Sequence, residues 1–389
     1  MKKILSMILA VLMLTGLCAC GGSGEGKGGE TATFQVGFGR ENITPDFPVA
    51  LSGGGDPNRI SESVIDYIYT TCVAITDPTG NTVLVITSDV QSVANSGAFN
   101  EGLRTAASNV TGVPAENILL CATHNHSGPS QSEAKVGGTE FKKLFTAAVE
   151  TACKNAMEDR APATMSAGEI KADGYVFPRH YKMMDGTYAG SSYGNLVVDQ
   201  IESIAYEGDS TLQMVQFNRE GKKPVLMMNL GAHATFFSST SIKTLSSDFP
   251  GPMREHIEGN SDVLVAYFIG PAGDQTPSTK YKPKDHNLDH RAYGKAVGQL
   301  VVDALPTLKA ANTGDVNLQL MEHTGKTNYN GTDRYVEAKQ IYDMFLAEGY
   351  SKSNAAAKSA GFISVYDARS IVTRSQLPKT QQIKLGALA

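Results

Sequence analysis

The sequence predicts an α/β protein, a single large domain in which a mixed central β-sheet is covered by α-helices. Strand-like and helix-like segments alternate along the chain, and several of the strands are nearly continuous apolar runs, as strands buried on both faces are. The chain has 389 residues, of which 41% are apolar and 19% charged. This composition is typical of a globular protein and excludes a disordered chain or one that crosses a membrane many times.

The first residues predict export. A short basic start, Lys2-Lys3, precedes an apolar run from Ile4 to Leu17 that is too short to cross a bilayer as a helix. The run ends in Leu-Cys-Ala-Cys, which resembles the bacterial lipobox, so residues 1–19 are a predicted lipoprotein signal peptide and Cys20 the lipidated residue. Residues 20–33 form a Gly-rich tether. We expect an exported protein, anchored by lipid to the bacterial membrane and facing outside the cytoplasm; an ordinary signal peptide with a chance cysteine is the alternative.

Cysteine number and net charge limit the remaining classes. After Cys20, only Cys72, Cys121 and Cys153 remain, an odd number that allows at most one disulfide. Their apolar surroundings favour buried small side chains over a redox or metal role. The formal charge of -5, without a Lys/Arg cluster, disfavours nucleic acid as a partner. The composition leaves the oligomeric state open.

The first half of the domain predicts a hairpin and a crossover. Residues 67–76 and 82–87 are β-rich runs separated by Asp-Pro-Thr-Gly, a strong turn signal. A helix over residues 98–108 and a short apolar strand over 118–122 then predict a βαβ unit. Residues 139–158 have apolar side chains at helical spacing, with Thr139 as the candidate N-cap.

The second half continues the alternation. Further predicted strands cover residues 163–170, 212–218, 225–230 and 263–269, and further predicted helices cover residues 290–308 and 334–348. The strands at 225–230 and 263–269 are the most continuously apolar, which predicts a central position in the sheet.

Polar residues with catalytic chemistry follow three of the buried strands. His124 and His126 come directly after the strand at 118–122, where open α/β sheets place their ligands. If the extended backbone continues, both imidazoles point to one side, where they could bind a metal or pair a ligand with an acid–base group. Two polar loop histidines without such a role are the alternative. His233 follows the strand at 225–230 among small residues, and a Gly-rich turn after residue 269 presents Asp274 and Thr276.

These residues carry a family resemblance. Residues 37–45 (Gly-Phe-Gly-Arg-Glu-Asn-Ile-Thr-Pro) resemble the start of the N-terminal catalytic domain of the neutral/alkaline, non-lysosomal ceramidases. Residues 122–129 (Ala-Thr-His-Asn-His-Ser-Gly-Pro) resemble the Ala-Thr-His-Thr-His-Ser-Gly-Pro signature of that family. The resemblance extends from about Phe34 to the end of the chain. It implies a zinc amidase that cleaves the N-acyl bond of ceramide or a related lipid.

The resemblance also implies residue roles. His124 and His233 would be zinc ligands, and His126 would hydrogen-bond to the substrate or protonate it. Arg179, where the family has an Asn-Arg pair, would stabilise the oxyanion. Asp274 and Thr276 fall on the family's Gly-Asp-x-Ser-Pro stretch, with threonine in place of serine, which puts ceramide itself in doubt more than hydrolysis. We expect Asp89, after the strand at 82–87, to orient one imidazole, with a structural role as the alternative.

Two histidines are too few for a catalytic zinc site. In the family, a glutamate and a tyrosine from a later segment complete it, so we expect residues 34–389 to be a catalytic domain that is incomplete at the C-terminus. Two alternatives to a ceramidase-like enzyme remain. One is a related metal hydrolase with a more polar amide or ester substrate, and the other is a non-catalytic surface lipoprotein that binds a ligand.

Overall fold

A computed structural model describes residues 34–53, 58–93, 98–191, 196–239, 241–282, 288–311, 314–316 and 318–388. The predicted signal peptide, Cys20 and the tether lie outside the described residues. Among those residues, none of the helices is both long and apolar enough to cross a membrane.

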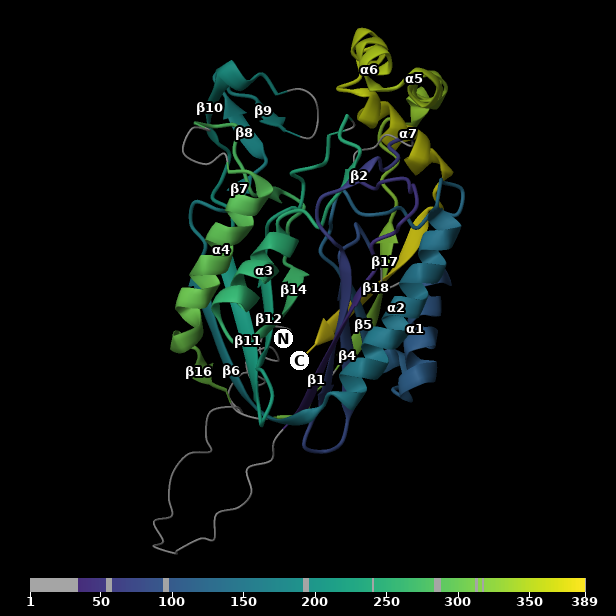
Figure 1. The fold of residues 1–389 in the computed structure, drawn as a ribbon. Coiled ribbons are helices and arrows are strands. Elements are labelled where there is room, and N and C mark those ends of the chain that lie inside the picture. Colours follow the sequence, from purple (N-terminus) through teal and green to yellow (C-terminus); the bar gives the residue numbers. More distant parts are fainter. Residues whose placement is uncertain are drawn as a thin grey trace, which may run out of the picture. The chain divides into compact units, whose positions relative to one another are not determined.

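A nine-stranded mixed sheet forms the centre of the described chain, in the order β14-β12-β11-β6-β1-β3-β4-β5, with β16 beside β6 (Figure 1). The pairs β4–β5 and β12–β14 are parallel, and the others are antiparallel. The strands are β1 (Phe34–Asn42), β3 (Tyr69–Thr76), β4 (Thr82–Ser88), β5 (Ile118–Ala122), β6 (Ala161–Lys171), β11 (Thr211–Arg219), β12 (Val225–Leu230), β14 (Leu264–Ile269) and β16 (Lys309–Ala310). The predicted mixed sheet is confirmed.

The sheet curls so that its two ends approach each other. The Thr87 hydroxyl on β4 donates to the carbonyl of Tyr267 on β14, over 2.7 Å. Alternate residues of each strand then face a shared interior, where Val73 and Val85 pack in one apolar cluster with Phe217 and Ala266. The other face of every strand remains available for helices.

Two pairs of helices cover those outer faces (Figure 1). The helices α1 (Ala98–Thr111) and α2 (Gly138–Glu158) enclose one apolar cluster with β3, β4 and β5. The helices α3 (Pro250–Asn260) and α4 (His290–Ala304) enclose another with β11, β12 and β14. Each half of the sheet is therefore buried on both faces, as its continuous apolar strands predict.

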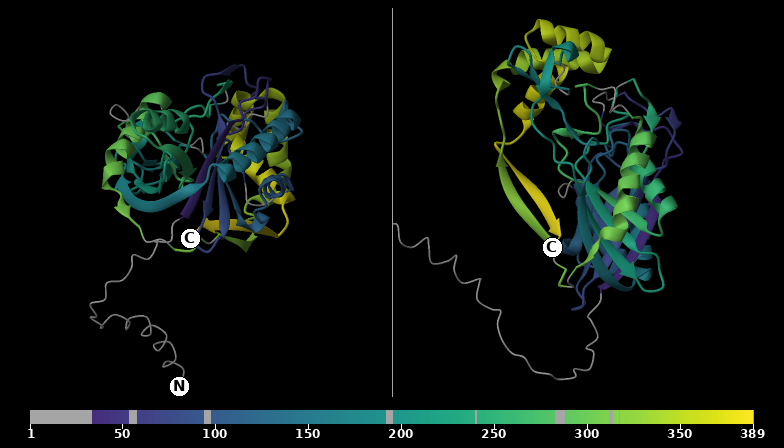
Figure 2. Two further views of the ribbon diagram at one scale, coloured as in Figure 1. Left: turned by 60° about the horizontal axis from the view of Figure 1, so that its bottom comes forward. Right: turned by 90° about the vertical axis from the view of Figure 1, so that its left-hand side faces the viewer.

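Smaller elements surround this centre. The short strands are β2 (Ser63–Val64) with β13 (Thr244–Leu245), β7 (Phe177–Pro178) with β15 (Gln275–Thr276), and the sheet of β8 (His180–Met183), β9 (Tyr188–Gly190) and β10 (Ile201–Ile204). The long ribbon of β17 (Leu318–Lys326) and β18 (Thr380–Leu388) leads to α5 (Tyr335–Glu348), α6 (Tyr350–Ser359) and α7 (Val365–Gln376), as Figure 2 shows. These three helices share an apolar cluster of their own.

The predicted hairpin and the βαβ crossover are both present, with boundaries within a few residues. One prediction of detail was wrong. Helix α2 begins at Gly138 after Gly137 in the left-handed region, so Thr139 lies in the first turn and is not the N-cap. Helix α3 was not predicted, because its start contains Pro250 and Pro252, residues that suggest a turn but are also tolerated in a first helical turn.

Candidate metal centre

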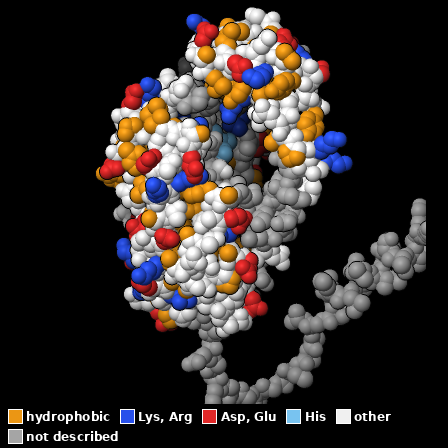
Figure 3. All heavy atoms as spheres, turned by 90° about the vertical axis from the view of Figure 1, so that its right-hand side faces the viewer, with side chains coloured by type: hydrophobic (Ala, Val, Ile, Leu, Met, Phe, Trp, Pro, Cys, Tyr) orange, Lys and Arg blue, Asp and Glu red, His pale blue; other side chains and the backbone are white. Residues whose placement is uncertain are grey.

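Three histidines from two strand ends converge in the folded chain. His124 and His126 follow β5, and His233 follows β12. Their ring centroids lie 4.4–4.9 Å apart, and one nitrogen from each ring lies within 4.8 Å of the others. His233 is buried, while His124 and His126 are half-buried, and Figure 3 shows histidine side chains inside a hollow of one face. His126 and His233 are 107 positions apart in the sequence, so the three rings meet only in the folded chain.

Each imidazole is oriented by the main chain. His124 Nδ1 lies 2.8 Å from the carbonyl oxygen of Gln91, and His233 Nδ1 lies 2.9 Å from that of Ala272. His126 makes a hydrogen bond to the backbone of Gly53. Because a carbonyl can only accept, the ring nitrogen that faces it carries the proton, and the other nitrogen keeps its lone pair.

The ring nitrogens that face one another could hold a metal ion. His126 Nε2 and His233 Nε2 lie 2.9 Å apart, and His233 Nε2 carries a lone pair because the Nδ1 atom of that ring donates to the carbonyl of Ala272. Burial, the largest effect, lowers the pKa of His126 to about 3 and that of His233 to about 4, and it lowers the pKa of His124 as well. Three neutral imidazoles fit a divalent ion such as zinc, which neutral ring nitrogens commonly bind.

The loop that carries two of these histidines is not extended. His124 has a φ of 57°, in the left-handed region, so the expected continuation of the strand geometry was wrong. The buried Asn125 fixes the turn by donating to the carbonyls of Asp89 and Ser246, over 3.2 and 2.7 Å. Gly53 has a φ of 93°, and a Cβ there would lie 2.5 Å from His126 Cβ. The close approach of these two segments therefore requires glycine at position 53.

Arg179 lies between β7 and β8, and its positive charge acts on all three imidazoles, lowering the pKa of each. Its main-chain N–H donates to the carbonyl of Asp274, over 2.8 Å, and its guanidinium donates to that of Gly273. The structure thus brings the sequence-predicted Arg179 to the histidine cluster and joins it to the turn after β14.

Asp274 and Thr276 lie in that turn without a hydrogen bond to the imidazoles among the contacts of the described residues. The Asp274 carboxylate accepts from the Tyr206 hydroxyl over 2.8 Å, and His180 Nδ1 lies 3.1 Å from the same hydroxyl. Thr276 is buried, and β15 there pairs with β7. No local pattern selects Tyr206 or His180, since their hydrogen-bond partners are distant in the chain.

The Asp89 carboxylate has a different partner from the one expected. Asp89 is 1% exposed, and its carboxylate oxygens accept from the guanidinium of Arg254 over 2.8 and 2.5 Å. One of them also accepts from the N–H of Tyr69, over 3.0 Å. Since main-chain carbonyls orient the imidazoles, the geometry favours the structural alternative for this side chain. The backbone of Asp89 still supports the site through Asn125.

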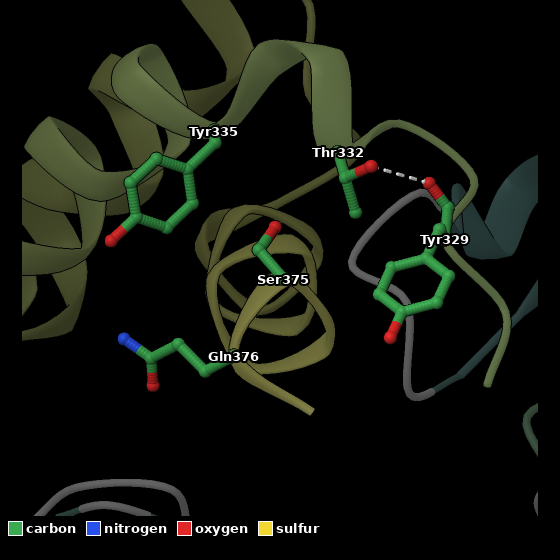
Figure 4. A pocket seen from close by; sticks show the side chains of 5 residues that line it. All are labelled: Tyr329, Thr332, Tyr335, Ser375 and Gln376. Atoms are coloured by element: carbon green, nitrogen blue, oxygen red, sulfur yellow. Dashed lines mark hydrogen bonds between the residues drawn. The ribbon is translucent and has the colours of Figure 1, made fainter. Parts of the chain in front are cut away.

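A cavity of about 380 Å³ is lined by residues of α5, of α7 and of the segment before α5 (Figure 4). Its lining residues are Tyr329, Thr332, Tyr335, Ser375 and Gln376. The hydroxyls of Tyr329, Thr332 and Ser375 donate to the carbonyls of Leu377, Tyr329 and Ile371, respectively. This cavity contains none of the clustered histidines and is not the metal centre.

Comparison with known proteins locates the same fold. No family model matches the chain, and no curated protein does. The solved structures that it resembles include a ceramidase complexed with C2 and the neutral ceramidase of Pseudomonas aeruginosa, each with a TM-score of 0.58 and 14% identity over 77% of this chain. The chain spans about half the length of these proteins, 47% and 49%. The resemblance to the neutral ceramidase fold is thereby confirmed.

Proposed function

We propose that this chain is a metal-dependent hydrolase that cleaves the N-acyl amide bond of ceramide or a related N-acyl lipid. The observation that carries the proposal is the convergence of three neutral imidazoles, from two strand ends, in a fold shared with neutral ceramidases. One of those structures is a complex with C2, which supports a lipid-like substrate for the fold.

Zinc is the proposed metal, with His124 and His233 as ligands. The Nδ1 atoms of these two rings face the carbonyls of Gln91 and Ala272, so their Nε2 atoms are oriented before any ion binds. A catalytic zinc ion activates water as a nucleophile and polarises a carbonyl oxygen. A catalytic zinc site uses three protein ligands, and His124 and His233 would supply two of them.

The other residues act on the substrate. We assign His126 to hydrogen bonding or proton transfer at the amide, because its Nε2 borders the cluster. Arg179 supplies a positive charge beside the cluster for the developing oxyanion. Asp274 and Thr276 line the turn that Arg179 contacts, and we propose that they help to position the substrate.

Metal content and substrate preference test this proposal. Purified protein is analysed for bound zinc and then assayed on a panel of N-acyl lipids and polar N-acyl amides and esters, before and after treatment with a chelator. We expect bound metal, chelator-sensitive hydrolysis, and a preference for N-acyl lipids. Metal binding without hydrolysis of any compound would support a ligand-binding lipoprotein, and preference for polar compounds would support the related hydrolase.

Substitution of each histidine separates their roles. We expect His124→Ala to lose both the metal and hydrolysis, since it removes a ligand. We expect His126→Ala to retain the metal and to lose roughly 10²–10⁴-fold in rate, as for a positioned acid–base group. If His126→Ala loses zinc as completely as His124→Ala does, both residues are ligands and our division of roles is wrong.

We also propose that Cys20 carries a lipid that anchors the protein to the outside of the bacterial membrane. The lipobox-like sequence and the Gly-rich tether after it motivate this proposal. Cys20→Ala should move the protein from the membrane fraction to the soluble fraction, with a mass that lacks acyl groups. Unchanged membrane association and an unchanged mass would contradict lipidation at this residue.

A further inference from the structure

Arg59 is a fully buried cation beside the histidine cluster. Its side chain is 0% exposed, and it lies in the loop between β1 and β2. No sequence pattern indicates this burial, because an isolated arginine in a polar loop is ordinarily solvent-exposed. Burial of a guanidinium is costly unless hydrogen bonds replace its hydration, so its partners in the fold reveal its role.

The guanidinium donates to four main-chain carbonyls among the described residues. Nη1 donates to Ser52 over 2.9 Å and to His126 over 2.8 Å. Nε donates to Ile242 over 2.5 Å, and Nη2 donates to Phe237. These carbonyls belong to three segments that are far apart in sequence, and we call this arrangement the Arg59 clamp.

Each of the three segments also contributes to the metal centre. The segment at 52–53 provides the backbone group of Gly53 that orients the His126 ring. The segment at 126 provides His126 itself, and its N–H donates to the carbonyl of Ala234 over 3.1 Å. Ala234 adjoins His233, and the chain continues from there to the carbonyls at 237 and 242. The clamp therefore joins the backbone around His126 to the backbone around His233.

Resting on the function proposed above, we propose that Arg59 is a positioning residue that fixes the separation of His126 and His233 and thereby the geometry of the metal centre. The guanidinium suits this role because it is planar and directs its donors in a fixed fork. A lysine ammonium has three donors at one point and cannot reach four carbonyls in three directions. Arg59→Lys retains the charge and removes the fork.

The test measures binding of Co²⁺ and Zn²⁺ to the metal-free full chain, together with the visible absorption spectrum of the Co²⁺ form. We expect Arg59→Lys to weaken binding of both ions by about 10–100-fold, because Arg59 holds the segment that follows the ligand His233 through the carbonyls of Phe237 and Ile242, and loss of a group that orients a metal ligand has this effect. The Co²⁺ spectrum should shift, because the spectrum reports the arrangement of the ligands. Thermal unfolding of each metal-free protein reports whether it is folded.

Arg104→Lys is the matched control. Arg104 is 1% exposed and its Nε donates to the carbonyl of Ile118 over 3.0 Å, at the opposite end of β5 from the histidines. We expect this variant to be destabilised but to bind Co²⁺ as the wild type does, with an unchanged spectrum. Equal weakening in both variants would mean that the effect is a general result of disturbing a buried arginine, and would overturn the proposal.

The remaining outcomes are also decisive. If folded Arg59→Lys binds both ions with wild-type affinity and spectrum, Arg59 does not position the centre. If Arg59→Lys and Arg59→Gln both fail to fold while Arg104→Lys folds, Arg59 is a folding residue and the proposal is overturned. If the wild type binds neither ion, the proposed function itself fails. The wild type alone shows that result, whereas failure of the Arg59 proposal appears only in the comparison of the variants.

Discussion

Asp248 is a buried acid in an unusual backbone conformation. Its side chain is 0% exposed and its φ is 55°, a region that aspartate and asparagine adopt more readily than most residues. The carboxylate accepts from the N–H groups of Phe249 and Phe237, over 2.8 and 3.4 Å. Loss of hydration outweighs these bonds and raises the pKa of Asp248 to about 7. Between pH 4 and 7, this acid is therefore protonated in the folded chain but ionised in the unfolded one.

The raised pKa predicts a pH-dependent stability. The unfolded chain releases this proton near pH 4 and the folded chain near pH 7, so stability contributed by Asp248 falls as the pH rises through that interval. We expect its share of the loss between pH 5 and pH 8 to be about 3 kcal/mol. Asp248→Asn retains the acceptor and tolerates the same φ but does not ionise. Urea unfolding across this pH range should show a flatter profile for the variant, and parallel profiles would contradict the assignment.

At the scale of elements, the contact between α2 and β1 depends on two glycines. A Cβ on Gly39 would lie 2.0 Å from the carbonyl oxygen of Ala152, and one on Gly37 would lie 1.9 Å from that of Ala156. Because glycine has no Cβ atom, the backbone of α2 can lie directly on β1. The apolar cluster between α2 and the sheet forms around this contact.

Gly39→Ala should therefore destabilise the protein, since the added methyl group meets the helix backbone and not a flexible side chain. We expect a loss of about 1–3 kcal/mol in the free energy of unfolding, as for overpacked cores. Gly102→Ala is the control, because Gly102 lies in α1 and a Cβ there meets no atom within 4 Å. That change should be neutral or stabilising, by up to about 1 kcal/mol. Equal effects at both positions would refute the packing argument.

At the scale of the whole molecule, an ion pair joins the two halves of the curled sheet. Asp89 follows β4, and Arg254 lies on α3, which covers the other half. Both side chains are buried, at 1% and 5% exposed for the residues. Removing one partner leaves the other charge without its counterion in a place that water does not reach.

Asp89→Asn should consequently cost about 3–5 kcal/mol of unfolding free energy. The matched control is Asp343→Asn, which alters the exposed pair of Lys339 and Asp343 on α5 and should change stability by less than about 1 kcal/mol. Chemical denaturation of the three proteins at one pH measures both differences. A loss at Asp89 no larger than that at Asp343 would show that the buried pair does not stabilise the contact between the halves.

Local sequence patterns were sufficient to predict much of the fold and part of the site. Continuous apolar runs and turn residues predicted β3, β4, β5, β12 and β14, because burial on both faces removes the need for alternating polar residues. The same logic placed His124, His126 and His233 at strand ends. The helices α6 and α7, and the proline-containing start of α3, were missed because their local signals are weak or ambiguous.

Which residues come into contact depends on the folded arrangement of the chain. The curl of the sheet brings β5 and β12 together, and no local pattern encodes a contact between residues more than a hundred positions apart. The groups that orient the imidazoles belong to the main chain at Gln91, Ala272 and Gly53, and every residue type has a main-chain carbonyl, so residue type does not reveal these partners. Asp89, whose residue type suggested a partner for histidine, binds Arg254 instead, because the fold places a guanidinium closer to it. Residue type determines what chemistry a position can perform, while packing determines which groups are near enough to perform it.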